Sequence, residues 1–297
     1  MSVVALPQSE PARTYEEGID RARAVMARDG AGILPAAKTA LLEHGKRVPL
    51  AVVLLHGYTN SPAQFAEFAP LVFERGVNVF VPRMPEHGDA DRLTDRIARL
   101  TANDLVRATS EALDIAGGFG ERVGVLGISM GGTQAAYAAQ HRNIDIAIPV
   151  APEFALLELP YPASRFVAHV LRWLPNFFLW WDPRDRERHP PATAYPRFST
   201  RALAQTLVIG DEVYAAARRQ APQARRIVTI VNRSDPAVNN DVTHNVVLEW
   251  QGWKPQCAEY VELRGLPQNH DIVDPQNPLA KTDLVYPRLL QALGLAA

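Results

Sequence analysis

Cysteine is almost absent from this chain of 297 residues, in which Cys257 stands alone. One cysteine excludes an intramolecular disulfide and argues against a cysteine-based metal site. An excess of charge is absent too, because 31 lysines and arginines face 32 aspartates and glutamates, giving a formal net charge of −1. No overall field therefore attracts nucleic acid or an anionic membrane surface, and we expect no nucleic-acid partner.

Long hydrophobic runs are also missing. The longest reach about half of the roughly 20 residues that span a bilayer. Residues 1–13 lack the basic segment and the apolar segment of an export signal. We therefore expect a soluble, cytoplasmic protein with no stable membrane insertion.

The composition itself is that of a globular protein, with 47% hydrophobic and 21% charged residues. These values exclude a disordered chain and a coiled coil. The length suits two domains, or one large α/β domain that carries an insertion.

Short apolar segments alternate with segments of helical periodicity from residue 50 onward. The run 51–55 is apolar at every position, which indicates a strand covered on both faces. The alternation predicts an α/β fold with a mostly parallel central sheet wrapped by helices. Strands are expected at 50–55, 77–81, 122–126, 145–150, 227–231 and 260–263, and helices at 62–74, 103–116, 131–140, 240–250 and in a last segment ending near 293.

Three further expectations concern a helix before the sheet, the pairing of the first strands and the end of one helix. Residues 15–28 form a helix before the sheet begins. Residues 39–42 and 50–55 form a hairpin around a turn at 44–46. Gly117 and Gly118 end the helix at 103–116.

The alternation breaks between residues 151 and 225, where proline and aromatic residues accumulate. We interpret this stretch as an inserted helical cap. The core is then formed by residues 38–150 and 226–297, and residues 1–37 form an N-terminal extension with a helix. The cap aromatics line a substrate pocket or touch a lipid interface, or they form the cap's own small core, which is the simpler interpretation. The candidates for substrate binding are Phe177, Phe178, Trp180 and Trp181.

The sharpest chemical signal is the segment 127–132, Gly-Ile-Ser-Met-Gly-Gly, where a buried strand gives way to a helix. A G-x-S-x-G segment at that place is typical of a nucleophilic serine on a strained turn. At the two glycine positions, any side chain larger than a hydrogen atom would clash. The pattern predicts that Ser129 is a nucleophile. A glycine-rich helix cap is the alternative.

A second segment, 56–60 (His-Gly-Tyr-Thr-Asn), follows an earlier buried strand. Acyl transfer needs donors aimed at the developing oxyanion, usually two backbone N–H groups. Met130, directly after the serine, supplies one, and Tyr58 is the best candidate for the other. We expect His56 to orient this loop; the alternative is an ordinary strand–helix turn.

A serine nucleophile also needs a base. His270 lies in a polar loop beyond the last strand, which places it at the carboxyl edge of the sheet beside the serine. His87 is the main rival. His244 in a helix, and His169 and His189 in the cap, are less well placed.

The base in turn needs an acid to orient it. Asp235 follows the strand at 227–231 and precedes His270, which matches the chain order Ser, Asp, His. Asp241 and Asp211 are the alternatives, and Asp235 could instead cap its own turn, since aspartate before proline favours turns.

Together these segments resemble the α/β-hydrolase fold and, within it, the bacterial monoacylglycerol lipase and carboxylesterase group. The resemblance covers residues 38–295 and is strongest before residue 150. It implies a triad of Ser129, Asp235 and His270, with the N–H groups of Tyr58 and Met130 as oxyanion hole. The group usually has glycine at the position of Asn60, so this chain departs from the pattern there. The segments that carry the resemblance are 56–59, Pro82-Arg83 with His87-Gly88, 127–133, Asp235 and 270–274.

The function expected from these residues is hydrolysis of a small-molecule carboxylic ester with an apolar acyl or aryl group. No motif indicates a metal or an organic cofactor. A thioesterase, an acyltransferase or a peptidase would use the same triad, and a ligand-binding protein that reuses the fold is the non-enzymatic alternative.

Overall fold

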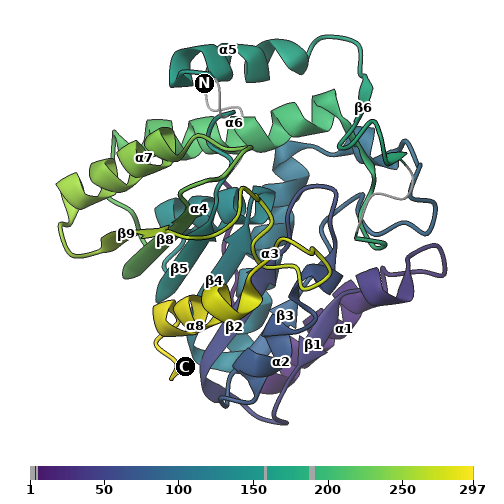
Figure 1. The fold of residues 1–297 in the computed structure, drawn as a ribbon. Coiled ribbons are helices and arrows are strands. Elements are labelled where there is room, and N and C mark those ends of the chain that lie inside the picture. The colour runs from purple at the N-terminus through teal and green to yellow at the C-terminus, as the bar shows by residue number, and fades with distance from the viewer. Residues whose placement is uncertain (1–3, 5, 157–158, 187–190, 297) are drawn as a thin grey trace.

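A seven-stranded sheet forms the centre of the molecule in the computed structural model, which describes residue 4 and residues 6–156, 159–186 and 191–296 (Figure 1). Its strand order is β1-β3-β2-β4-β5-β8-β9, and every pair is parallel except the antiparallel pair of β1 with β3. The predicted, mostly parallel sheet is thus confirmed. The strands are β1 (Ala40–Leu42), β2 (Val48–Leu55), β3 (Asn78–Val81), β4 (Gly120–Ile128), β5 (Ile146–Val150), β8 (Arg226–Asn232) and β9 (Ala258–Leu263).

Helices cover both faces of this sheet. Side chains of β2 alternate between two apolar clusters, with Val53 in one and Val52 in the other, because successive residues of a strand point to opposite faces. One cluster is completed by α1, α3, α4, α6 and α7, and the other by α2 and α8. The helices are α1 (Tyr15–Met26), α2 (Phe68–Phe73), α3 (Ala102–Phe119), α4 (Met130–His141), α5 (Tyr161–Leu171), α6 (Thr200–Ala217), α7 (Asn240–Trp253) and α8 (Thr282–Ala292).

The expected hairpin between residues 39–42 and 50–55 was wrong. β1 pairs with β3, and both edges of β2 are occupied by β3 and β4. The buried side chain of Asn78, at the start of β3, holds the connecting turn: its Oδ1 accepts from the His44 N–H at 2.8 Å, and its Nδ2 donates to the Lys46 carbonyl at 2.9 Å. The pairing of β1 with β3 therefore depends on the contact between Asn78 and the connecting turn.

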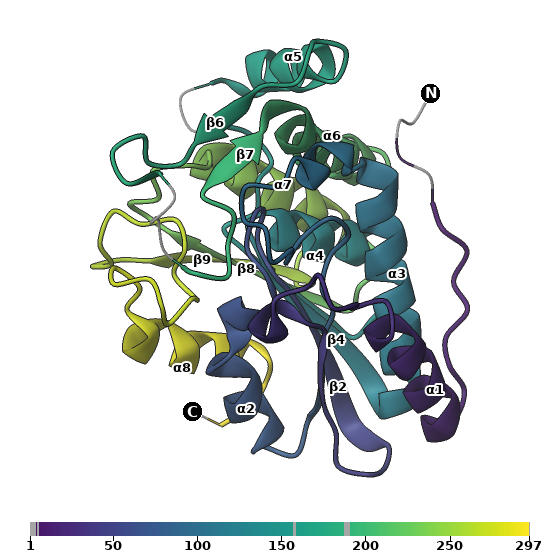
Figure 2. The same cartoon turned by 90° about the vertical axis from the view of Figure 1, so that its right-hand side faces the viewer.

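The expected end of the third helix at Gly117 was also wrong, because α3 runs on to Phe119. The two glycines serve close packing instead. A Cβ atom on Gly118 would lie 2.5 Å from the carbonyl oxygen of Thr14, so only glycine lets the chain before α1 approach α3. That approach is visible where the N-terminal segment runs along α3 (Figure 2).

Between β5 and β8 lies the stretch 151–225, here called the cap segment. It contains α5, α6 and an antiparallel ribbon of β6 (Phe178–Trp180) and β7 (Arg197–Ser199). α6 contacts α4 and α7, and α5 lies outside α6 (Figures 1 and 2). Asp211 of α6 fastens α5, accepting from the Tyr161 hydroxyl at 2.5 Å and bonding His169 Nε2 at 3.0 Å.

The parallel strands all end at one edge of the sheet. Gly127 of β4 lies opposite Leu55 of β2, and Ile128 lies opposite Val150 of β5. The loops after β2, β4, β8 and β9 therefore share this edge, where ligands bind in open α/β sheets. Within the described part of the chain, no helix is both long and apolar enough to cross a membrane.

Candidate active site

Ser129 occupies the turn between β4 and α4 in a backbone conformation that is rare for a residue with a side chain. Its φ is 57° and its ψ is −120°, and strain of this kind is concentrated at functional sites. The turn is held by the Ser129 N–H, which donates to the Val150 carbonyl at 2.9 Å, and by the Thr133 N–H, which donates to the Ser129 carbonyl at 2.8 Å. The turn thus holds Ser129, partly exposed, at the junction between β4 and α4.

The glycines around Ser129 make this turn possible. A Cβ atom on Gly131 would overlap the Leu55 carbonyl, and one on Gly127 would overlap the Gly131 carbonyl. Gly57 of the neighbouring loop lies close by, because a Cβ atom there would be in van der Waals contact with the Cβ atom of Ser129, at 3.4 Å. The loop after β2 therefore packs directly against the serine.

Asp235 and His270 meet at the same sheet edge. Oδ2 of Asp235 lies 2.8 Å from Nδ1 of His270. Oδ1 of Asp235 accepts from the Ala237 N–H at 2.8 Å and the Val238 N–H at 3.2 Å, which fixes the carboxylate. The Asp235 side chain is fully buried, whereas the His270 side chain remains 24% exposed. This pairing leaves Nε2 of the imidazole to exchange a proton.

The charge around His270 favours the imidazolium form. Burial alone would lower the pKa of His270, but the Asp235 carboxylate raises it through charge and hydrogen bonding. The carboxylates of Asp271 and Glu153 add to this, so the pKa of His270 lies above its ordinary value.

Asn232 holds the loop that carries His270, and sequence analysis missed it. Its buried side chain donates to the Pro267 carbonyl at 2.9 Å and to the Asn269 carbonyl at 2.7 Å. Asn232 is the last residue of β8, so this side chain ties the loop to the sheet. A polar residue at the end of a buried strand is the signal that could have identified it.

His56 and His87 are both buried and both structural. Nδ1 of His56 lies 2.9 Å from the Gly57 carbonyl, and its Nε2 accepts from the Met84 N–H at 3.0 Å. Nδ1 of His87 lies 2.7 Å from the Pro85 carbonyl, and its Nε2 accepts from the Thr59 N–H at 3.2 Å. Burial lowers the pKa of His87 to about 4 and that of His56 well below its ordinary value. Both rings stay neutral and support the loop after β2.

The two expected oxyanion donors belong to neighbouring segments. Met130 begins α4, where the first backbone N–H groups have no acceptor inside the helix. Tyr58 lies in the loop that packs against Ser129. Its hydroxyl donates to the Ser199 carbonyl at 2.9 Å and accepts from the Ser199 N–H at 3.0 Å, which joins this loop to β7.

The four aromatic cap candidates divide into different environments. Trp181 reaches the loop after β2, where its Nε1 donates to the Thr59 hydroxyl at 2.9 Å. Phe178 packs against the apolar cluster that contains Val53, and the Arg197 guanidinium lies 4.3 Å above its ring. Trp180 lies beneath the guanidinium of Arg186.

Phe177 is 58% exposed to solvent. Of these four side chains, the described contacts bring only Trp181 to the loop beside Ser129.

The other candidates for base and acid have different partners. His169 and Asp211 bond each other within the cap segment, and the His244 ring lies 4.6 Å from that of Tyr260. Asp241 is exposed in the first turn of α7. His189 lies outside the residues that the structure describes.

Glu153 is a buried carboxyl group that sequence analysis did not single out. It follows β5 at the same sheet edge and is 5% exposed. Its N–H donates to the Thr133 hydroxyl at 2.8 Å, and its carboxyl bonds the Thr206 hydroxyl at 2.6 Å. Burial raises the pKa of Glu153 to about 7, against the opposing effects of Thr206 and His270. A charged residue three positions after a buried strand was the available signal.

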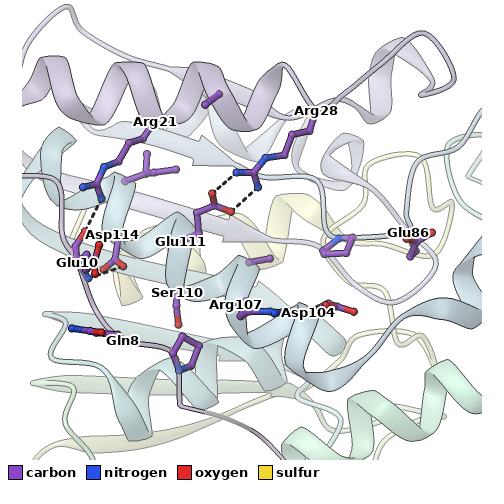
Figure 3. Close-up of a pocket in the computed structure, with 15 residues that line it drawn as sticks. Gln8, Glu10, Arg21, Arg28, Glu86, Asp104, Arg107, Ser110, Glu111 and Asp114 are labelled. Atoms are coloured by element: carbon purple, nitrogen blue, oxygen red, sulfur yellow. Dashed lines mark hydrogen bonds and ion pairs between the residues drawn. The ribbon is translucent and has the colours of Figure 1, made fainter.

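A groove of about 790 Å³ lies apart from these residues, between the N-terminal segment, α1 and α3 (Figure 3). Its arginines are already paired. Arg28 bonds Glu111 at 2.6 and 2.8 Å, Arg107 bonds Asp104 at 2.5 Å, and Arg21 forms an ion pair with Glu17. The described arginines of this groove therefore offer no uncompensated charge to a ligand.

Comparison with known proteins adds a family match. The model of a family described as "Alpha/beta hydrolase family" matches residues 52–292. A thermostable monoacylglycerol lipase from Bacillus sp. (strain H-257) is 30% identical over 132 residues, which are 44% of this chain and 50% of that protein. The chain thus matches about half the length of this relative.

Solved structures extend the likeness over most of the chain. A structure from work on the metagenome-derived lipolytic enzymes LipS and LipT has a TM-score of 0.69 and 20% identity, covering 87% of this chain and 98% of its own. The monoacylglycerol lipase of Paleococcus ferrophilus has a TM-score of 0.63 and 18% identity, covering 86% and 98%. At such identities these structures show a shared fold.

Proposed function

The chain belongs to the alpha/beta hydrolase family, and from this premise we propose that it is a serine hydrolase of carboxylic esters. The observation that carries the proposal is the placement of three side chains at one sheet edge. Ser129 stands on a strained turn with a φ of 57°, and the Asp235–His270 pair, joined at 2.8 Å, follows two strands of the same sheet. A ligand-binding protein has no use for a strained serine at a sheet edge that also carries an imidazole oriented by a carboxylate.

In the proposed first half-reaction, the Ser129 hydroxyl attacks the ester carbonyl while Nε2 of His270 takes its proton. Asp235 holds the Nδ1–H and stabilises the imidazolium that forms. The N–H groups of Tyr58 and Met130 stabilise the oxyanion of the tetrahedral intermediate. The imidazolium then protonates the departing alcohol, and the acyl group stays on Ser129.

In the second half-reaction, water replaces the alcohol. His270 removes a proton from the water, which attacks the acyl-enzyme through a second oxyanion intermediate. The imidazolium returns the proton to the Ser129 oxygen as the carboxylic acid leaves. The enzyme is regenerated without any cofactor entering the proposed steps.

The proposed substrate class is a small ester of an apolar acyl or aryl acid. The match to a protein named as a monoacylglycerol lipase supports a monoacylglycerol or a similar carboxylester. The division into an N-terminal extension, a core and a cap segment is part of the same proposal, and location in the cytoplasm remains a prediction from the sequence.

The proposal is tested with p-nitrophenyl esters from acetate to dodecanoate, a monoacylglycerol and an acyl thioester, each offered to the purified chain. We expect ester turnover that a fluorophosphonate inhibits irreversibly. Faster turnover of the thioester would make the chain a thioesterase with the same triad. Absence of both turnover and inhibition would contradict a serine hydrolase.

A further inference from the structure

Two carboxylates, one buried and one partly buried, lie between the loop after β2 and the loop that carries His270. They belong to Asp271 and Asp274, and the side-chain amide of Asn60 donates to both, at 3.3 Å to Asp271 Oδ2 and at 3.1 Å to Asp274 Oδ2. Asn60 is 6% exposed and Asp274 is 1% exposed. Oδ1 of Asn60 accepts from the Ser61 N–H at 2.8 Å, which fixes the orientation of the amide.

Gln64 makes a second connection between the same loops. Its Nε2 donates to Asp271 Oδ2 at 2.8 Å, and its Oε1 accepts from the Gly57 N–H at 2.8 Å. Gly57 precedes the proposed oxyanion donor Tyr58, and Asp271 follows the proposed base His270. One side chain therefore joins the backbone beside the oxyanion donor to the residue beside the base.

We propose that Asn60 and Gln64, bonded to Asp271 and Asp274, form a clamp that sets the position of the oxyanion donor Tyr58 relative to the base His270. The clamp residues touch no reacting atom, so they are positioning residues. This inference rests on the proposed function, because it assigns a role within that reaction. A misplacement of about 1 Å between reacting groups can reduce the rate about a hundredfold.

The chemistry of the cluster explains why an amide suits position 60. Buried carboxylates need donors, and two of them together repel each other. An asparagine supplies one N–H₂ group that can serve both, together with an oxygen for the Ser61 N–H. Glycine at this position would leave Asp274 Oδ2 without this donor.

Several other titratable groups face the cluster. Burial raises the pKa of Asp274 to about 6, and the neighbouring charges of Asp271 and Glu67 contribute to the increase. Tyr286 of α8 is influenced by the same three carboxylates, and its hydroxyl donates to the Val273 carbonyl at 2.8 Å.

The charge of Asp271 also acts on His270, because that carboxylate helps to raise the pKa of the imidazole, together with Asp235 and Glu153. A change of charge within the clamp should therefore be visible in the pH profile of the base. The pH profile thus reports the charge of the cluster, whereas kcat and amide hydrogen exchange report the positions of the two loops.

An exchange of the donor and the acceptor tests the clamp. Asn60→Asp places a third carboxylate against Asp271 and Asp274, and we expect turnover per active site to fall about tenfold to a hundredfold, with KM changed less than kcat. The added negative charge should also shift the acid limb of the pH profile to higher pH.

In the double variant Asn60→Asp/Asp274→Asn, the amide introduced at position 274 can donate to the carboxylate introduced at position 60, while its oxygen accepts from the Gln276 N–H. Activity and the acid limb should return most of the way to the wild type.

Titration with a fluorophosphonate counts the active sites, so that a folding defect is not read as a loss of kcat, and thermal unfolding is measured for each variant. Asn143→Asp makes the same change at an exposed position in the turn before β5, and it should leave turnover and the pH profile unaltered. Normal turnover per active site in Asn60→Asp would overturn the clamp, whatever the position of the acid limb. So would a double variant that is folded but no better than the single one.

Amide hydrogen exchange in residues 57–60 and 269–274 provides a readout that does not depend on activity. Exchange should accelerate in both loops in Asn60→Asp and slow again in the double variant. If the wild type neither turns over esters nor reacts with the fluorophosphonate, the proposed function fails, and the exchange data still decide whether the two loops are clamped. Unchanged exchange in Asn60→Asp would reject the clamp in that case too.

Discussion

Trp181 of the cap segment donates its indole N–H to the hydroxyl of Thr59, 2.9 Å away on the loop that packs against Ser129. Three more bonds join the cap segment to this loop. The Tyr195 N–H donates to the Thr59 carbonyl at 2.8 Å, and the Tyr58 hydroxyl bonds the backbone of Ser199. Thr59 itself has a φ of 64°, a strained conformation that such contacts maintain. The cap segment and the proposed oxyanion loop are thus one connected unit.

This connection predicts the effect of Trp181→Phe, which removes the indole N–H but keeps an aromatic ring. We expect kcat/KM to fall several-fold by a similar factor for acetate and dodecanoate esters, because the lost bond acts on the loop and not on the acyl chain. Trp180→Phe is the matched control and should have a smaller effect. A penalty that grows with chain length, by up to about 0.8 kcal/mol for each lost methylene contact, would instead show that Trp181 lines an acyl pocket.

A second prediction concerns the acid. Asp235→Asn should reduce kcat by roughly 10³- to 10⁴-fold, because an amide favours the wrong tautomer of His270. Asp241→Asn, in the exposed first turn of α7, should change kcat little. Steady-state kinetics of the two variants decide the assignment, and the opposite ranking would transfer the role to Asp241.

The third prediction is a pH profile. The base must be neutral to accept the serine proton, so kcat/KM should rise with pH through the pKa of His270. Because Asp235 raises that pKa, the rise should be centred above 6.5, the ordinary value for histidine. Removing carboxylate charge with Glu153→Gln should move the limb to lower pH. A wild-type limb centred below 6.5 would contradict the assigned environment.

A fourth prediction concerns the pH dependence of stability. The pKa of Glu153 is about 7 in the folded protein, above its ordinary 4.5, so the folded state binds this proton more tightly than the unfolded chain. Its contribution to stability is complete below about pH 4.5 and is lost as the pH rises through about 7. Glu153→Gln should therefore raise the free energy of unfolding at about pH 9 by up to about 3 kcal/mol and change it little at about pH 4.

Urea unfolding at both pH values measures this difference. Glu121→Gln, at an exposed position in β4, is the control and should show no such pH dependence. Equal stability of Glu153→Gln and the wild type at the higher pH would show that Glu153 ionises without penalty.

Much of the fold could be predicted because its signals are local. Continuous apolar runs such as 51–55 indicate strands buried on both faces, and the glycines around Ser129 indicate the strained turn, since no other residue fits. The pairing of β1 with β3 could not be predicted, because it depends on Asn78, more than thirty residues away, holding the turn at 44–46.

The candidate site divides in the same way. Asp235 and His270 could be proposed from chain order and from their places after buried strands. The bonds from Asn60 and Gln64 to Asp271 and Asp274 cross more than two hundred residues and leave no periodic pattern. Likewise, aromatic composition suggested a cluster in the cap, but only the fold shows which of its tryptophans reaches Thr59.

The measurement that tests the central claim most directly is identification of the residue that a fluorophosphonate modifies, by mass spectrometry of the digested protein. The account predicts one adduct per chain, on the peptide that contains Ser129. Ser129→Ala should abolish labelling and lower kcat on the order of 10⁴- to 10⁶-fold while the protein stays folded. Modification of a different residue, or turnover by Ser129→Ala within about tenfold of the wild type, would contradict the account.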